Sequence, residues 1–376
     1  MSIINIPYET MGLDRIARLR QYLASFLKHN TIRKLINFLK IECQILRQSD
    51  HVCGMPYILK VESTNICNYH CPVCYENRKK HDFDGARGYG RMKTDDFRKI
   101  IDELSPWLYR INLYGFGEPF LFDEIFDMIR YASDHDVRVA ITSNFSTVDQ
   151  NKIDRILDSG LEHLVISIDG VDQTSYEKYQ VGGDYESVLR NIRMLIQTKK
   201  ERKSRYPRVT WQYLITKHNH HLQKEAVLIA KDLGIEIRFS RIGVDLTNEK
   251  ERSEWLPDDP IREQLRFEDS VIKKQKRTPL CTWLYRTAFV NWDLGVSPCC
   301  NYYTGEKNHD FGNLKEKAFS DIWQGKRYAA ARRIFKDRST NLDGDNICHR
   351  CIVKREDLRK ILQQQHDGCR DPKTCS

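Results

Sequence analysis

The chain has 376 residues, 40% of them hydrophobic, which is enough to fill the core of one large domain and a smaller one. Its formal charge of +9 is modest and its basic residues lie in short scattered groups, so the composition argues against nucleic-acid binding. No apolar run approaches the roughly 18 residues of a membrane span. The N-terminus also lacks an apolar signal core, so we expect a cytoplasmic protein.

Residues 13–47 form a basic, amphipathic stretch that predicts an N-terminal helical segment over residues 1–55. Leu13, Ile16, Leu19, Leu23, Phe26 and Leu27 recur at helical spacing, with arginines and Lys28 between them. Such a segment either covers one end of the main domain or makes peripheral contact with a membrane surface or a partner.

From Tyr57 onward, short β-branched runs alternate with stretches of helical period. The predicted strands are Tyr57–Glu62, Arg110–Tyr114, Val137–Thr142, His163–Asp169, Arg208–Thr216 and Ile235–Phe239. The predicted helices are Thr94–Leu104, Asp123–Ser133, Asp149–Ser159, Tyr185–Thr198 and Leu222–Leu233. Five β/α repeats and a sixth strand predict a parallel α/β sheet, curled or open, over residues 56–245. We expect a connector over 246–280, a small cysteine-bearing domain over 281–355 and a polar tail over 356–376.

Twelve cysteines indicate metal or redox chemistry, because in a reducing compartment structural disulfides are rare. Three of them, Cys67, Cys71 and Cys74, lie in the sequence TNICNYHCPVCY directly after the first predicted strand. Three thiolates at this spacing can wrap one face of an iron–sulfur cube and leave the fourth iron open. A zinc knuckle is the alternative, with His70 and His81 as the only local histidines.

Short polar residues and glycines follow the next three predicted strands, at the edge where parallel β/α sheets carry their chemistry. These residues are Gly115, Gly117, Glu118, Ser143, Asn144, Ser167 and Asp169. Glycines allow the main chain to approach a ligand closely, and short polar side chains suit hydroxyl groups. Turn formation is the alternative for each of them alone.

The cysteine loop and these polar segments together resemble the radical S-adenosylmethionine (SAM) superfamily. The resemblance implies a partial (β/α)6 TIM-like barrel in which SAM chelates the open iron of a [4Fe-4S] cluster. It implies that the segment Gly115, Gly117 and Glu118 receives the SAM amino group, and that Ser143, Asn144, Ser167 and Asp169 hydrogen-bond its ribose and carboxylate. Related chains often carry an arginine at the position of Gln180. Because glutamine has no charge, it cannot make the charged contact that an arginine can make there.

A second set of cysteines follows residue 280: Cys281, the pair Cys299 and Cys300, and Cys348 and Cys351. This set resembles the C-terminal auxiliary-cluster extension called SPASM, or its shorter form, twitch. The resemblance implies one auxiliary [4Fe-4S] cluster on Cys281, Cys299, Cys348 and Cys351, without an open iron and suited to electron transfer. In related domains a glycine precedes this ligand cysteine at a fixed spacing. If Gly295 corresponds to that glycine, the spacing selects Cys300 as the ligand. If Leu294 takes the place of the glycine, the spacing selects Cys299, which we favour. A structural zinc is the alternative. Cys369 and Cys375 lie in the polar tail, without identified co-ligands.

The resemblance implies reductive cleavage of SAM to a 5′-deoxyadenosyl radical that removes a substrate hydrogen atom, with electrons from a donor such as flavodoxin or ferredoxin. We expect oxidation of a sugar, aminocyclitol or other natural-product intermediate. The alternatives are a peptide- or protein-modifying maturase and a radical epimerase. A non-catalytic iron–sulfur or zinc-binding protein is the hypothesis from a different class. The sequence identifies no further catalytic residue.

Overall fold

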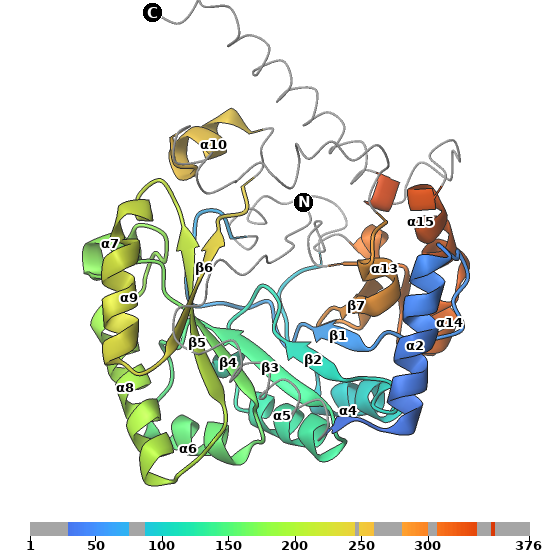
Figure 1. Cartoon of the computed structure of the whole chain (residues 1–376), viewed down its shortest axis with the longest axis horizontal. Coiled ribbons are helices and arrows are strands. Elements are labelled where there is room, and N and C mark those ends of the chain that lie inside the picture. Colours follow the sequence, from blue (N-terminus) through green and yellow to red (C-terminus); the bar gives the residue numbers. More distant parts are fainter. Residues whose placement is uncertain are drawn as a thin grey trace, which may run out of the picture.

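The computed structural model describes residues 29–74, 87–244, 248–258, 280–299, 307–336 and 347–349 (Figure 1). In this part of the chain the strands form one nine-stranded sheet in the order β6-β5-β4-β3-β2-β1-β7-β8-β9. The strands are β1 (Ile58–Val61), β2 (Arg110–Leu113), β3 (Arg138–Ser143), β4 (His163–Ser167), β5 (Arg208–Ile215), β6 (Glu236–Arg241), β7 (Thr287–Val290), β8 (Gly295–Ser297) and β9 (Gly312–Asn313). Strands β1 to β6 pair in parallel, and the sheet stays open because β6 and β9 are its edges. The predicted partial barrel is confirmed.

Amphipathic helices cover the convex face of the parallel strands (Figure 1). They are α4 (Thr94–Leu104), α5 (Glu124–Asp134), α6 (Gln150–Asp158), α7 (Gln173–Glu177), α8 (Tyr185–Glu201) and α9 (Gln223–Asp232), with 3₁₀ turns at Pro119–Leu121 and His220–Leu222. Their apolar stripes are buried against alternate residues of the strands, such as Leu59 and Val61 of β1, which are fully buried. Asp149 and Asp184 cap the N-termini of α6 and α8.

All six predicted strands and all five predicted helices are present, with ends that differ by only a few residues. The short helix α7 was not predicted, and neither was α10 (Glu249–Trp255), which lies in the segment expected to be a connector. Five of the seven residues of α10 are charged, so the sequence offered no apolar stripe to indicate a helix.

The cysteine-bearing region continues the main sheet. Strand β7 pairs in parallel with β1, and β8 and β9 follow as antiparallel strands. The helices α13 (Trp283–Arg286), α14 (Phe319–Trp323) and α15 (Lys326–Lys336) lie beside this extension, with a 3₁₀ turn at Lys307–His309. Sequence patterns did not indicate this pairing, because nothing local in a four-residue strand specifies its neighbour. The domain boundaries remain predictions.

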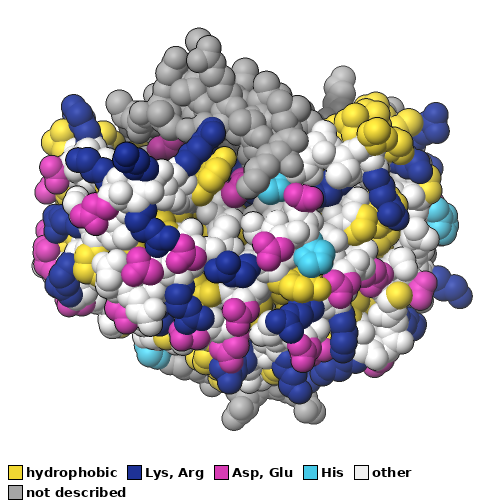
Figure 2. Space-filling view, turned by 90° about the horizontal axis from the view of Figure 1, so that it is seen from below, with side chains coloured by type: hydrophobic (Ala, Val, Ile, Leu, Met, Phe, Trp, Pro, Cys, Tyr) yellow, Lys and Arg dark blue, Asp and Glu magenta, His cyan; other side chains and the backbone are white. Residues whose placement is uncertain are grey.

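Helix α2 (Ile32–Leu46) is the described part of the N-terminal helical segment and packs beside α13 (Figure 1). Residues 13–28 of that prediction lie outside the described residues, as do Cys300, Cys351, Cys369, Cys375 and His81. Within the described ranges no helix has both the length and the apolar character needed to cross a membrane. On the face shown in Figure 2, basic and acidic side chains are interspersed.

Candidate active site

The three cysteines of the first set lie together at the carboxyl end of β1. Cys67, Cys71 and Cys74 are all partly buried, and the Cys74 N–H donates to the Cys71 carbonyl over 3.0 Å. Burial, and then the charges of Cys74, Asp169 and Cys67, raise the pKa of the Cys71 thiol. The thiols therefore lie within electrostatic reach of one another and of Asp169, as the ligands of one cluster must.

Contacts from distant segments hold the cysteine loop in place. The hydroxyl groups of Tyr69 and Tyr176 are 3.0 Å apart in the core. The His70 N–H donates to the Val181 carbonyl over 3.0 Å, so the loop after β4 supports the cysteine loop from one side. Because these contacts are made within the protein, the conformation of the cysteine loop does not depend on a bound cluster alone.

The glycine-rich segment after β2 packs directly on the residues that lead into the cysteine loop. A Cβ atom added to Gly117 would lie 2.5 Å from the Thr64 carbonyl oxygen and 2.6 Å from that of Ile66. The Glu118 N–H donates to the same Ile66 carbonyl over 2.9 Å. A Cβ on Gly115 would lie 2.5 Å from the Glu62 side chain. Glycine is needed at both positions because another side chain would push these two segments apart.

The Glu118 carboxylate is buried and bonded to the protein on both oxygens. Oε1 accepts from the Ser143 hydroxyl over 2.7 Å and from the Phe120 N–H over 3.1 Å, and Oε2 accepts from the Asn144 N–H over 2.7 Å. Burial raises the pKa of Glu118, while these hydrogen bonds oppose that shift. Glu118 thus fixes the end of β3 against the end of β2. Its role as a SAM ligand, with that of Gly115 and Gly117, stays a prediction.

Asn144 connects the end of β3 to the cysteine loop. Its Nδ2 donates to Oδ1 of Asn68, which lies between Cys67 and Cys71, over 2.9 Å. Asn68 in turn donates to the Ser146 hydroxyl over 2.9 Å. The predicted ligand segment after β3 and the cysteine loop are therefore one hydrogen-bonded unit, which places Asn144 beside the cluster position.

Gln180 fixes the residues at the end of β4 that the sequence assigned to SAM. Its Oε1 accepts from the Asp169 N–H and its Nε2 donates to the Ser167 carbonyl, each over 2.8 Å. An amide offers one acceptor and one donor, which matches this pair of main-chain groups, whereas arginine has no acceptor. Asp169 also accepts from the Leu214 N–H over 2.7 Å, and burial raises its pKa to about 7. The sequence signalled Gln180 only as a departure from the family.

Replacing Gln180 by leucine is expected to lower the free energy of unfolding by about 1–3 kcal/mol, because it leaves a buried N–H and a buried carbonyl without partners. Urea unfolding followed by tryptophan fluorescence measures this loss. Gln197→Leu is the matched control, because Gln197 is exposed on α8 and its loss should change stability by no more than about 0.5 kcal/mol. Equal stability of Gln180→Leu and wild type would remove this role from Gln180.

The second cysteine region contains a buried aromatic cluster around Arg332. The Arg332 guanidinium carbon lies 4.8 Å from the ring centroid of Trp323, 5.2 Å from that of Tyr328 and 5.6 Å from that of Tyr285. Burial lowers the pKa of Arg332 to about 10. No local sequence pattern indicated Arg332.

The pKa shifts of two tyrosines in this cluster depend in part on nearby thiols. Burial raises the pKa of Tyr285 to about 12, and Cys281 contributes to the shift. Burial also raises the pKa of Tyr328, with further contributions from Cys348 and Cys299. Cys281 is thus within electrostatic reach of Tyr285, and Cys299 and Cys348 are within reach of Tyr328. Their role as ligands of one auxiliary cluster stays a prediction, and the fourth expected ligand, Cys351, lies outside the described residues.

The turn between β7 and β8 bears on which cysteine of the 299–300 pair is a ligand. Leu294 has φ of 75°, in the region that favours glycine, and Gly295 is not in that region. The glycine-like position of the hairpin therefore falls on Leu294, and this spacing favours Cys299. Gly295 is required for another reason: a Cβ there would lie 1.9 Å from Oδ2 of Asp310.

Arg87, the first described residue after the cysteine loop, links this region to the second cysteine region. Its guanidinium is buried and donates to both oxygens of Asp310 over 2.8 Å, and it also pairs with Asp293. Asp310 accepts from the Ser297 hydroxyl over 2.7 Å, just before the Cys299 position. The two cysteine regions are thus connected by a buried ion-pair network, which sequence patterns did not predict because its members lie more than 200 residues apart.

An open parallel β/α sheet with a three-cysteine loop at the carboxyl end of its first strand defines an iron–sulfur enzyme on a partial barrel. Family models match in both regions: that of the radical SAM superfamily covers residues 61–207, and that of the SPASM iron–sulfur cluster-binding domain covers residues 281–352. The chain belongs to the radical SAM superfamily and carries a C-terminal SPASM domain.

Similar proteins support this family assignment. The tungsten-containing aldehyde ferredoxin oxidoreductase cofactor-modifying protein of Pyrococcus furiosus is 25% identical over 74% of this chain and 84% of its own. The Fe-coproporphyrin III synthase of Methanosarcina barkeri is 21% identical over 69% of this chain and 71% of its own. The crystal structure of Streptococcus suis SuiB bound to precursor peptide SuiA shares the fold, with a TM-score of 0.58 and 13% identity over 80% of this chain and 71% of SuiB.

The two domains imply three cofactors: SAM, the [4Fe-4S] cluster that binds it and an auxiliary cluster. The residues present fit these groups. The thiols of the first trio belong to one loop and interact electrostatically, and three thiolates are the ligand set of a cluster with one open iron. In the second set, Cys281 is within electrostatic reach of Tyr285, and Cys299 and Cys348 are within reach of Tyr328.

Proposed function

We propose that this enzyme is a radical SAM oxidoreductase that dehydrogenates a sugar, an aminocyclitol or another polar natural-product intermediate. The observation that carries the proposal is the polar character of the concave face of the sheet, the face turned away from the covering helices. Most strands carry half-buried polar residues between buried apolar ones. The half-buried polar residues are Lys60, Asn112, Thr142, Ser167, Gln212, Arg238 and Ser240.

The strand register brings these side chains into neighbouring pairs. Lys60 lies opposite Asn112, and Gln212 lies between Ser167 and Arg238. Arg238 donates to the Gln212 side chain. A substrate rich in hydroxyl and amino groups can exchange hydrogen bonds with such a surface.

When bound, the cofactors supply two things: a 5′-deoxyadenosyl radical, which removes a substrate hydrogen atom, and an acceptor for an electron from the substrate radical. The residues of this chain hold and orient these groups. Cys67, Cys71 and Cys74 would bind the SAM cluster, and Asn144 and Asp169 would hydrogen-bond SAM. A reduced flavodoxin or ferredoxin is the proposed electron donor.

A peptide or protein substrate is the second candidate. SuiB, which shares the fold, was crystallised with its precursor peptide, and peptide main chains can also use a polar surface. Epimerisation instead of oxidation would require a hydrogen atom to return to the substrate radical, and the cysteine of the 299–300 pair that is not a ligand is the candidate donor.

The test is anaerobic turnover of the reconstituted enzyme with SAM, dithionite and panels of aminocyclitols, sugars and candidate precursor peptides. We expect 5′-deoxyadenosine to form with a small polar substrate, together with a product that has lost two hydrogens by mass spectrometry. A substrate deuterated at the reacting carbon should transfer the label to 5′-deoxyadenosine. A product of unchanged mass would establish epimerisation, and modification confined to the peptides would replace the small-molecule proposal.

A further inference from the structure

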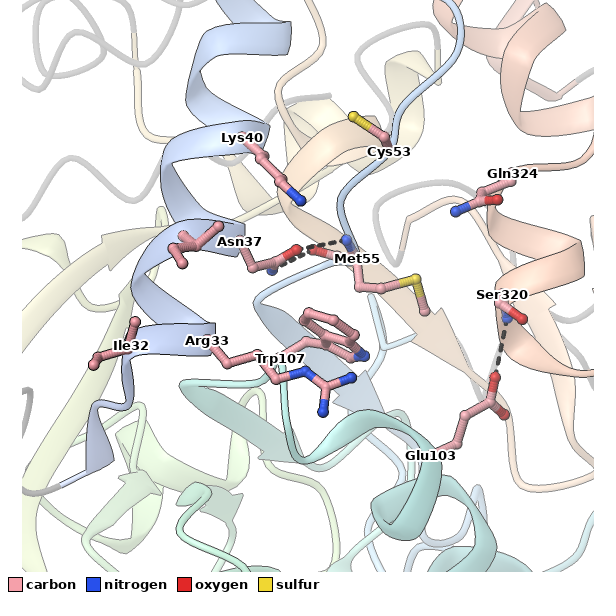
Figure 3. A pocket seen from close by; sticks show the side chains of 11 residues that line it. Ile32, Arg33, Asn37, Lys40, Cys53, Met55, Glu103, Trp107, Ser320 and Gln324 are labelled. Atoms are coloured by element: carbon pink, nitrogen blue, oxygen red, sulfur yellow. Dashed lines mark hydrogen bonds between the residues drawn. The ribbon is translucent and has the colours of Figure 1, made fainter.

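Helix α2 carries apolar residues on two sides. Phe38, Ile41 and Ile45 pack on the core, beside two buried polar residues, while a second group of apolar side chains is exposed. Lys34 and Asn37 are each 2% exposed. The Lys34 ammonium group donates to the Asp136 carbonyl over 2.8 Å, and Asn37 exchanges two hydrogen bonds with the main chain of Met55 (Figure 3). Apolar side chains fill the outer side: Ile32, Leu35, Ile36, Leu39 and Leu46 are between 41% and 84% exposed. The helix therefore has a second apolar stripe in addition to the one that it buries against its own domain.

The outward residues follow the spacing of a coiled-coil seam. Ile32, Ile36, Leu39, Cys43 and Leu46 are separated by four, three, four and three residues, so they occupy alternating a and d positions over two heptads. A seam of this period is what a second helix packs on.

A groove of about 750 Å³ runs beside the seam (Figure 3). Ile32 and Ile36 form one wall, Trp107 and Met55 lie at its base, and Ser320 and Gln324 of α14 form the far wall. A flat bilayer cannot enter such a groove, whereas the side chains of a helix lying on the seam can.

The charges beside the seam select the partner. Arg33, Lys40 and Arg47 are exposed and lie seven residues apart, so every e position of the heptads is basic. The Arg33 guanidinium stacks 4.0 Å from the ring centroid of Trp107 at the groove. Glu42, the one acidic residue of α2, is already bonded to Arg286 and Tyr57. An antiparallel second copy of α2 would place basic e positions opposite one another, which opposes self-association.

We propose that the seam and groove of α2 are a docking site for an acidic amphipathic helix of a partner polypeptide. Its apolar residues would pack on Ile32, Ile36 and Leu39, and its acidic residues would pair with Arg33, Lys40 and Arg47. The site spans the full length of α2, about 22 Å for 15 residues.

The test uses a fluorescein-labelled peptide of three heptads with leucine at a and d and glutamate at e and g, and a matched peptide with lysine at e and g. Fluorescence anisotropy with the full-length reconstituted enzyme is expected to show the glutamate peptide binding at least about tenfold more tightly, with the difference reduced at about 0.5 M salt. The double change Ile36→Asp, Leu39→Asp should abolish binding. Arg33→Glu, Lys40→Glu should reverse the preference between the peptides.

Leu228→Asp is the control. Leu228 is a helical leucine that is 66% exposed, and its helix α9 lies far from α2 (Figure 1). All variants should retain helical circular dichroism and 5′-deoxyadenosine formation. Failure of the glutamate peptide to bind, equal binding of both peptides, or binding unaffected by the double change overturns the proposal. A dimer seen by light scattering that Ile36→Asp, Leu39→Asp dissociates would also overturn the proposal. Binding to phosphatidylglycerol vesicles without binding to either peptide would overturn it as well.

Discussion

Replacing Cys67, Cys71 and Cys74 together by alanine is expected to abolish the formation of 5′-deoxyadenosine from SAM and dithionite. The three thiolates are the only protein ligands expected for the cluster that binds SAM, and no other cysteine of the described residues lies in this loop. Iron per chain should fall from about eight atoms to about four, because the auxiliary cluster keeps its own ligands. Anaerobic iron and sulfide analysis and chromatography of the nucleoside product measure both effects.

The matched control is Cys43→Ala, Cys53→Ala, which removes two exposed thiols that belong to neither expected ligand set. It should keep the full iron content and full SAM cleavage. The supports of the cysteine loop, the contact between Tyr69 and Tyr176 and the bond from His70 to Val181, do not involve a thiol, so the triple variant should remain folded. Retained SAM cleavage in the triple variant, or zinc without sulfide in the wild type, would contradict the assignment.

The polar residues at the carboxyl edge have a structural role that their assignment as SAM ligands did not include. Glu118 joins the ends of β2 and β3, Asn144 joins the end of β3 to the cysteine loop, and Gln180 fixes the end of β4. Each bond links a segment expected to contact SAM to a neighbouring segment of the same edge. The position of the cluster and the shape of the SAM pocket are therefore coupled, and a change in one should be felt in the other.

Local patterns predicted those parts of the fold and site that depend on local chemistry. Strands such as His163–Ser167 are short apolar runs that end in a polar turn, and the cysteine trio carries its ligand spacing within eight residues. The pairing of β7 with β1 and the Arg87 network with Asp310 join residues more than 200 positions apart. Such contacts depend on how the completed sheet brings segments together, and no periodicity records them.

The second large effect is expected at the auxiliary site. Cys281→Ala, Cys348→Ala should leave SAM cleavage measurable but abolish formation of the oxidised product, because the substrate radical would lose its electron acceptor. Iron should fall to about four atoms per chain, all in the SAM cluster. The ratio of 5′-deoxyadenosine to oxidised product, measured by mass spectrometry, separates this uncoupling from a general loss of activity.

A pair of neighbouring cysteines provides the matched control for this site. Cys299→Ala should reproduce the loss of iron and of product, because the glycine-like φ of Leu294 sets the spacing that selects Cys299. Cys300→Ala should keep both. The reverse result would assign the ligand to Cys300. Full product formation after Cys281→Ala, Cys348→Ala would instead mean that the auxiliary cluster does not accept the electron. Arg332 would then serve only to close the aromatic core formed by Tyr285, Trp323 and Tyr328.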